Sequence, residues 1–177
     1  MPVTIVDYDP AWPNRFAEQR DAILSIADGR IVAIEHFGST SVPGLAAKPI
    51  IDIVVAVKSV DEDGLALSEA VGQLGYVPFD AGMPGRLMLT RDVDGVRTQH
   101  LHIVPLERWD LLKERLMRDW LLAHPADRDR YAALKRDLAD SNLDGLDYTK
   151  GKTALVQAIV DAARAERGLP SEDVWEE

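Results

Sequence analysis

Short apolar runs with the length of strands dominate the pattern of hydrophobic and polar positions in the first part of the chain. Runs of this kind, rich in Val and Ile and bounded by polar or turn-forming residues, predict strands. They are residues 3–6, 31–37, 50–57, 76–79, 86–92 and 96–104. Asp94 and Gly95 stand between the last two runs, and because this pair favours a tight turn we expect these two strands to form a hairpin.

Apolar residues at helical spacing mark the segments between several strands and most of the chain after residue 105. The predicted helices are residues 9–28, 59–74, 106–122, 126–139 and 149–167. We therefore expect an α/β (α+β) fold, with a mixed sheet, flanking helices and a helical C-terminal half. The length of 177 residues suits a single domain, with a core at residues 1–105 and helices at residues 106–168.

Composition and charge argue against several classes of function. The formal net charge of −10 argues against broad nucleic-acid binding, which needs a basic surface. The absence of cysteine excludes disulfides and thiolate chemistry. No segment has the pattern of a signal peptide or the length of a membrane span, so we expect a cytoplasmic protein that does not contact membranes.

One carboxylate interrupts the most apolar of the predicted strands. Asp52 lies within residues 50–57, where a charged side chain is costly unless it is paired, hydrogen-bonded or bound to a metal. On the second strand of the predicted hairpin, His100 and His102 share one face because side chains alternate. If these strands are neighbours, the three residues form a site for a divalent metal of unspecified identity. The alternatives are histidines in ordinary structural hydrogen bonds and an Asp52 that pairs with Lys48 or an arginine.

Two polar segments are candidates for phosphate binding. Gly38, Ser39 and Thr40 follow a predicted strand, and their backbone N–H groups and hydroxyls can bind phosphate oxygens. The C-terminal segment "GLDYTKGKT" approaches a P-loop, but five residues instead of four separate its glycines and no strand precedes it. We therefore reject the P-loop. Lys150 and Lys152 are then either anion ligands or part of a solvated helix start.

Several motifs together resemble the GrpB family, within the nucleotidyltransferase superfamily. They are "YDPAWPNRF" at residues 8–16, "HFGSTSVPGLAAKPIIDI" at 36–53, "HLHIV" at 100–104, "RDWLLAHP" at 118–125, "YAALK" at 131–135 and "YTKGK" at 148–152. The resemblance implies a nucleotidyltransferase-like sheet, in which Ser39 would hold phosphates and Asp52 a divalent metal for phosphoryl transfer. The superfamily's second carboxylate would fall two residues after Asp52, where this chain has Val54.

Two functions fit these residues and this resemblance. The first is an enzyme that transfers a nucleotidyl or phosphoryl group and uses Asp52 as its catalytic metal ligand. The second is a non-catalytic module that binds a nucleotide or other phosphorylated small molecule, and Val54 favours it. The sequence does not specify the substrate, the acceptor or the oligomeric state.

Further candidates for binding the phosphorylated ligand lie outside the glycine-serine loop. Lys48 is a candidate cation near that loop. Arg118, Tyr131, Lys135 and Lys152 lie on three predicted helices, and these helices are expected to line a cleft for an anion. The alternative is that Arg118 pairs with an acid and Tyr131 packs in the core.

Overall fold

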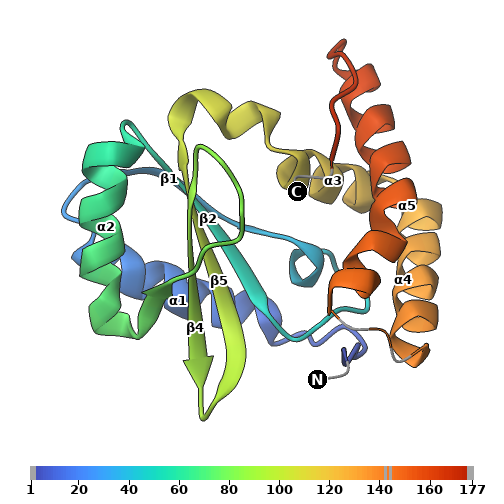
Figure 1. The fold of residues 1–177 in the computed structure, drawn as a ribbon, viewed down its shortest axis with the longest axis horizontal. Coiled ribbons are helices and arrows are strands. Elements are labelled where there is room, and N and C mark those ends of the chain that lie inside the picture. The colour runs from blue at the N-terminus through green and yellow to red at the C-terminus, as the bar shows by residue number, and fades with distance from the viewer. Residues whose placement is uncertain (1–2, 142, 144, 175–177) are drawn as a thin grey trace. The chain divides into compact units, whose positions relative to one another are not determined.

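A five-stranded mixed sheet, in the order β1-β2-β5-β4-β3, forms from the first part of the chain. Figure 1 labels β1, β2, β4 and β5 of this sheet. Its strands are β1 (Ile31–Phe37), β2 (Ile51–Val57), β3 (Tyr76–Pro78), β4 (Leu87–Val93) and β5 (Val96–Pro105). β2 and β5 are parallel, and the other neighbouring pairs are antiparallel. The predicted mixed sheet is confirmed, and all five strands lie within one residue of their predicted bounds.

This computed structural model describes residues 3–141, 143 and 145–174, and the chain divides into two units. The sheet unit consists of Pro10–Phe37 and Ile50–Asp110 and holds all five strands. The helical unit consists of Met1–Asp9, Gly38–Pro49 and Leu111–Glu176. Segments that are far apart in the sequence therefore come together within each unit.

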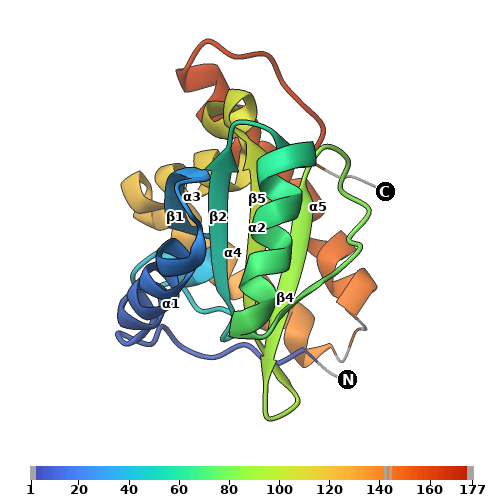
Figure 2. The ribbon, with the colours of Figure 1, turned by 90° about the vertical axis from the view of Figure 1, so that its left-hand side faces the viewer.

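One face of the sheet packs against helices of the sheet unit. α1 (Trp12–Ile26) and α2 (Leu65–Ala70) lie on this same face (Figure 2). α2 is the middle of a longer helical segment, with a π-helical turn at Val60–Gly64 before it and a 3-10 turn at Val71–Leu74 after it. The side chains of Ile53, Val55, Leu101 and Ile103 are fully buried, and Gly64 lies against Ile103. Apolar burial on this face therefore stabilises the sheet.

The hydroxyl of Ser59 caps the start of the second helical segment. The backbone N–H of Glu62 donates a hydrogen bond to the Ser59 hydroxyl at 3.2 Å. This bond satisfies one of the amide groups that have no partner within a helix's first turn.

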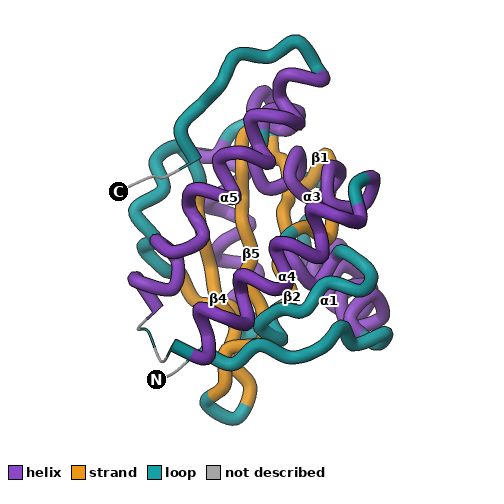
Figure 3. Tube along the Cα trace, turned by 90° about the vertical axis from the view of Figure 1, so that its right-hand side faces the viewer, coloured by secondary structure: helices purple, strands orange, loops and turns teal. Residues whose placement is uncertain are grey.

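Three longer helices pack together in the helical unit (Figure 3). They are α3 (Lys113–Ala123), α4 (Pro125–Asp140) and α5 (Gly145–Glu166). Their core contains the buried residues Val42, Leu45, Ala46, Leu121, Tyr131, Ala132 and Ile159. The predicted helical C-terminal half is confirmed. Within the part of the chain that the structure describes, no helix is both long and apolar enough to cross a membrane.

Several element boundaries differ from the prediction, and α1 begins at Trp12 and not at residue 9. The helix predicted from residue 106 is a 3-10 segment followed by α3, because Leu112 has an extended backbone, with φ −60° and ψ 119°, that interrupts the helix. α5 begins at Gly145, four residues earlier than predicted. The predicted strand at residues 3–6 is reduced to a single bridge between Val6 and Ala47.

The turn between β4 and β5 gives a test of the fold. Asp94 and Gly95 both have positive φ, at 52° and 77°, as a tight hairpin turn requires. Gly95→Ala should lower the free energy of unfolding by about 1–2 kcal/mol, because a Cβ is disfavoured in this conformation. Gly72→Ala is the matched control: its Cβ meets no atom within 4 Å and its φ is not positive, so it should be neutral or slightly stabilising. Urea unfolding measures both, and equal effects would contradict the proposed turn.

Candidate functional site

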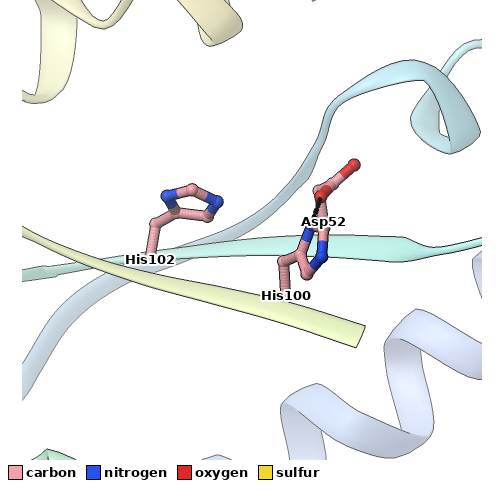
Figure 4. Close-up of side chains that lie close together, drawn as sticks. All are labelled: Asp52, His100 and His102. Carbon is pink, nitrogen blue, oxygen red and sulfur yellow. Dashed lines mark hydrogen bonds and ion pairs between the residues drawn. The ribbon is translucent and has the colours of Figure 1, made fainter. Parts of the chain in front are cut away.

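The pairing of β2 with β5 brings the predicted metal ligands together. Asp52 is the register partner of His100, and Val54 is the partner of His102. Partners on neighbouring strands point to the same face, so these side chains leave the sheet on the face opposite α1 and α2. Figure 4 shows Asp52, His100 and His102 on this face, and one potential ligand atom from each lies within 4.8 Å of the others. The predicted cluster is confirmed as an arrangement of side chains.

Asp52 and His100 form the closest contact in this cluster. His100 Nδ1 lies 2.9 Å from Asp52 Oδ1, and the two side chains are 22% and 26% exposed. The carboxylate in the apolar strand is therefore hydrogen-bonded. With the proton on Nδ1, this bond fixes the orientation of the imidazole, and a metal held by both residues would take the place of that proton.

His102 is the more buried histidine, with 6% of its surface exposed. The Phe37 ring meets it edge-on, with 5.1 Å between ring centroids and 78° between ring planes. Phe37 is itself 1% exposed and is the register partner of Asp52 on β1. Because Phe37 is so tightly packed, it restricts the rotation of the His102 ring. Phe37 could not be identified from the sequence, because its place beside His102 depends on the register between β1 and β2.

The chemistry of the donors suits some divalent metals better than others. One carboxylate and two imidazoles match the preferences of Zn²⁺, Co²⁺ and Fe²⁺, whereas Mg²⁺ prefers oxygen ligands throughout. Three protein ligands also leave a coordination position for water or substrate. Val54 is fully buried and supplies no oxygen, so Asp52 is the only carboxylate of β2.

A second set of predicted residues gathers around the loop after Gly38 in the helical unit. Ser39 begins a 3-10 turn, and Lys135 on α4 donates a hydrogen bond to its hydroxyl at 3.0 Å. The Lys135 ammonium also lies 4.6 Å from the centre of the Tyr131 ring, although the whole residue is only 2% exposed. A buried ammonium is costly, so these polar and aromatic contacts stabilise a charge that apolar packing alone would not.

Two further lysines of the helical unit contact one tyrosine ring. The ammonium groups of Lys48 and Lys152 each lie 4.7 Å from the centre of the Tyr148 ring. Tyr148 is 1% exposed, and its burial, with a smaller effect of Tyr131, raises the pKa of its phenol. Tyr148 was not among the predicted ligand residues, although Lys152 follows it by four residues, the spacing at which helical side chains meet.

The remaining predicted ligand residues are distributed differently. Arg118 forms an ion pair with Asp119 at 2.8 Å, and Tyr131 belongs to the apolar core, which matches the alternatives considered for both. Thr40 is buried, and Lys150 is exposed on α5. The roles of all these residues in ligand binding stay predictions.

The buried phenol of Tyr148 predicts a dependence of stability on alkaline pH. Its pKa in the folded chain is above the ordinary value of 10.0, so the unfolded chain loses the proton first. The contribution of the neutral phenol is complete below pH 10 and is lost as the pH rises further. Tyr148→Phe should therefore reduce the fall in the free energy of unfolding above pH 10. Urea unfolding from pH 8 to 11.5 measures this, and parallel curves for the two proteins would contradict it.

Comparison with solved structures supports the observed fold. The chain matches the crystal structure of the conserved protein GrpB from Enterococcus faecalis with a TM-score of 0.83 and 33% identity, over 93% of this chain and 99% of that chain. It also shows a likeness to Cid1, an RNA terminal uridylyl transferase, with a TM-score of 0.48 and 19% identity, over 76% and 43% of the two chains. The Cid1 likeness is too weak to carry an argument about activity.

Comparison of sequences identifies the family. A UPF0157 protein of Halalkalibacterium halodurans is 34% identical over 173 residues, which are 92% of this chain and 83% of the relative. The family profile described as GrpB protein matches residues 2–162. The chain therefore belongs to the GrpB family.

Proposed function

We propose that this protein binds a nucleotide or other phosphorylated small molecule together with a divalent metal, and transfers a nucleotidyl or phosphoryl group from it. The observation that carries the proposal is the group of potential ligand atoms from Asp52, His100 and His102, all within 4.8 Å of one another. Partial burial of three polar side chains on one face of a sheet has an energetic cost, and the packing of the sheet does not require it.

The three residues would hold the metal, and Asp52 is the catalytic ligand of this proposal. A metal bound there supplies a positive charge that stabilises negative charge on phosphate oxygens during transfer. In the transfer step, an acceptor oxygen forms a bond to phosphorus while the bond to the leaving phosphate breaks. The proton of the acceptor passes to solvent water, because both imidazoles of the cluster would be occupied by the metal.

The lysines of the helical unit support an anionic ligand. The whole chain carries a formal net charge of −10, yet Lys48 and Lys152 share one aromatic ring and Lys135 is almost completely buried. Gathered cations repel one another, and an anion with several oxygens relieves this repulsion. Ser39 adds a hydroxyl that can also bond a phosphate oxygen.

A second candidate function is a binding module without transfer chemistry. Val54 favours it, because a fully buried valine stands where the superfamily has its second metal-binding carboxylate. In this alternative the phosphorylated ligand binds, but the charge needed to complete a two-metal centre is absent.

Metal titration calorimetry tests the first proposal. Zn²⁺ and Co²⁺ should bind more tightly than Mg²⁺, and Asp52→Asn should weaken their binding by about 10- to 100-fold. Asp61→Asn, the same change at an exposed carboxylate of the sheet unit, is the control and should change the affinity by less than about 2-fold.

A nucleotide panel with and without Zn²⁺ separates the two functions. Metal-dependent nucleotide binding that Asp52→Asn abolishes supports the transferase. Nucleotide binding that is indifferent to metal and to Asp52→Asn supports the binding module. If the protein binds neither metal nor any nucleotide, both functions are wrong.

The two neighbouring lysines of α5 give a matched pair for the anion site. Lys152 contacts the Tyr148 ring, whereas Lys150 is exposed on the same helix. Lys152→Met should weaken the binding of pyrophosphate and of ATP by about 10-fold, because it removes one close charge from the anion. Lys150→Met removes the same charge from the exposed position and should have an effect below about 2-fold. Calorimetry with pyrophosphate and with ATP measures both affinities. Equal losses of affinity in the two variants would contradict a specific role of Lys152 and would mean that only the overall charge of the protein matters.

A further inference from the structure

A second carboxylate lies in the same row of the sheet as the position where β2 carries Val54. Glu35 on β1 is the register partner of Val54, and Val54 is the partner of His102 on β5. Register partners share a face, so Glu35 is on the face that carries Asp52, His100 and His102. Glu35 is half-buried there. β1 therefore carries the carboxylate of Glu35 directly beside Val54, the position at which β2 has no carboxylate.

Glu35 and Asp52 are diagonal neighbours across the β1–β2 pair, because Phe37 is the direct partner of Asp52. Diagonal neighbours in an antiparallel pair are about 7–8 Å apart, a separation that long side chains span. The group of atoms within 4.8 Å comprises only the other three residues, so Glu35 would reach them by a change of rotamer. A glutamate that is not fully buried can change between staggered conformations, and binding to the metal would replace the interaction that Glu35 makes here.

The charges favour this movement when a divalent cation is bound. Asp52 supplies one negative charge, and both imidazoles bind metals in their neutral form. A dication held by these three residues keeps an excess positive charge in a partly buried place, and a second carboxylate neutralises it. The adjacent His36 points to the opposite face, where its ring stacks on Phe16 at 4.9 Å. Among these two neighbouring polar residues of β1, only Glu35 faces the cluster.

We propose that Glu35 is the fourth protein ligand of the metal centre and replaces, from the neighbouring strand, the carboxylate that Val54 excludes from β2. This inference rests on the proposed metal binding by Asp52, His100 and His102. It predicts a centre of two carboxylates and two imidazoles, with a net charge of zero when a dication is bound, and expansion to five ligands would admit a substrate oxygen.

Metal affinity and the spectrum of bound cobalt test the role of Glu35. In calorimetry with Zn²⁺ and Co²⁺, Glu35→Gln should weaken binding by about 10- to 100-fold. Glu62→Gln, the same change at an exposed residue of the sheet unit, should leave the affinity within about 2-fold. The visible absorption of Co²⁺ depends on the number and type of its ligands, so Glu35→Gln should also change the spectrum of the cobalt-loaded protein, while Glu62→Gln should not.

The possible failures of the two proposals can be distinguished. If wild type binds metal and Asp52→Asn loses it, but Glu35→Gln keeps the wild-type affinity and cobalt spectrum, Glu35 is not a ligand and the three-residue site stands. If wild type binds no metal, the proposed metal site is wrong and the role of Glu35 is wrong with it. Circular dichroism of the metal-free variants reports folding. Should Glu35→Gln fail to fold, Glu35→Asp keeps the charge but shortens the reach: weaker binding with a changed spectrum supports the proposal, and unchanged binding overturns it.

Discussion

The parallel pairing of β2 with β5 is the constraint on which the candidate metal centre depends. It sets Asp52 directly beside His100 and leaves His102 one row further along the same face. Side chains alternate along a strand, so a shift of this register by one residue would send the histidines to the face that packs against α1 and α2. Fully buried side chains on that face, such as Leu101 and Ile103, oppose such a shift, because it would bring them out of the core. Apolar packing on one face therefore fixes polar geometry on the other.

Each polar feature that we connect with function carries an energetic cost that the local structure reduces. The Asp52 carboxylate accepts a hydrogen bond from His100, and the buried Lys135 ammonium donates one to Ser39. Lys48 and Lys152 lie over the face of the Tyr148 ring, where the negative face of the π-system attracts cations. These contacts allow charged groups to persist in partly buried places, and such places are where charges act most strongly on a ligand.

Membership of the GrpB family concerns the fold of this chain, whereas the valine at position 54 concerns the chemistry of its candidate metal site. The family match extends over most of the chain, and it agrees with the mixed sheet and the helices that follow it. Val54 concerns chemistry, because it leaves Asp52 as the only carboxylate of β2. The two histidines of β5 and Glu35 of β1 supply donors from the strands on either side of β2. A metal centre built in this way would differ from the usual magnesium site in the metal that it prefers.

The sequence by itself determined the strands, the hairpin turn and the helical C-terminal part, because these follow from short-range patterns of apolar and turn-forming residues. It also identified Asp52, His100 and His102, since a carboxylate in an apolar strand and a His-x-His pair are visible in one dimension. It did not determine the break in the helix at Leu112, where tertiary structure overrides helical spacing. Nor could it find Phe37 or Glu35 as neighbours of the cluster. Their place depends on the register between β1 and β2, which only the packing of the folded sheet decides.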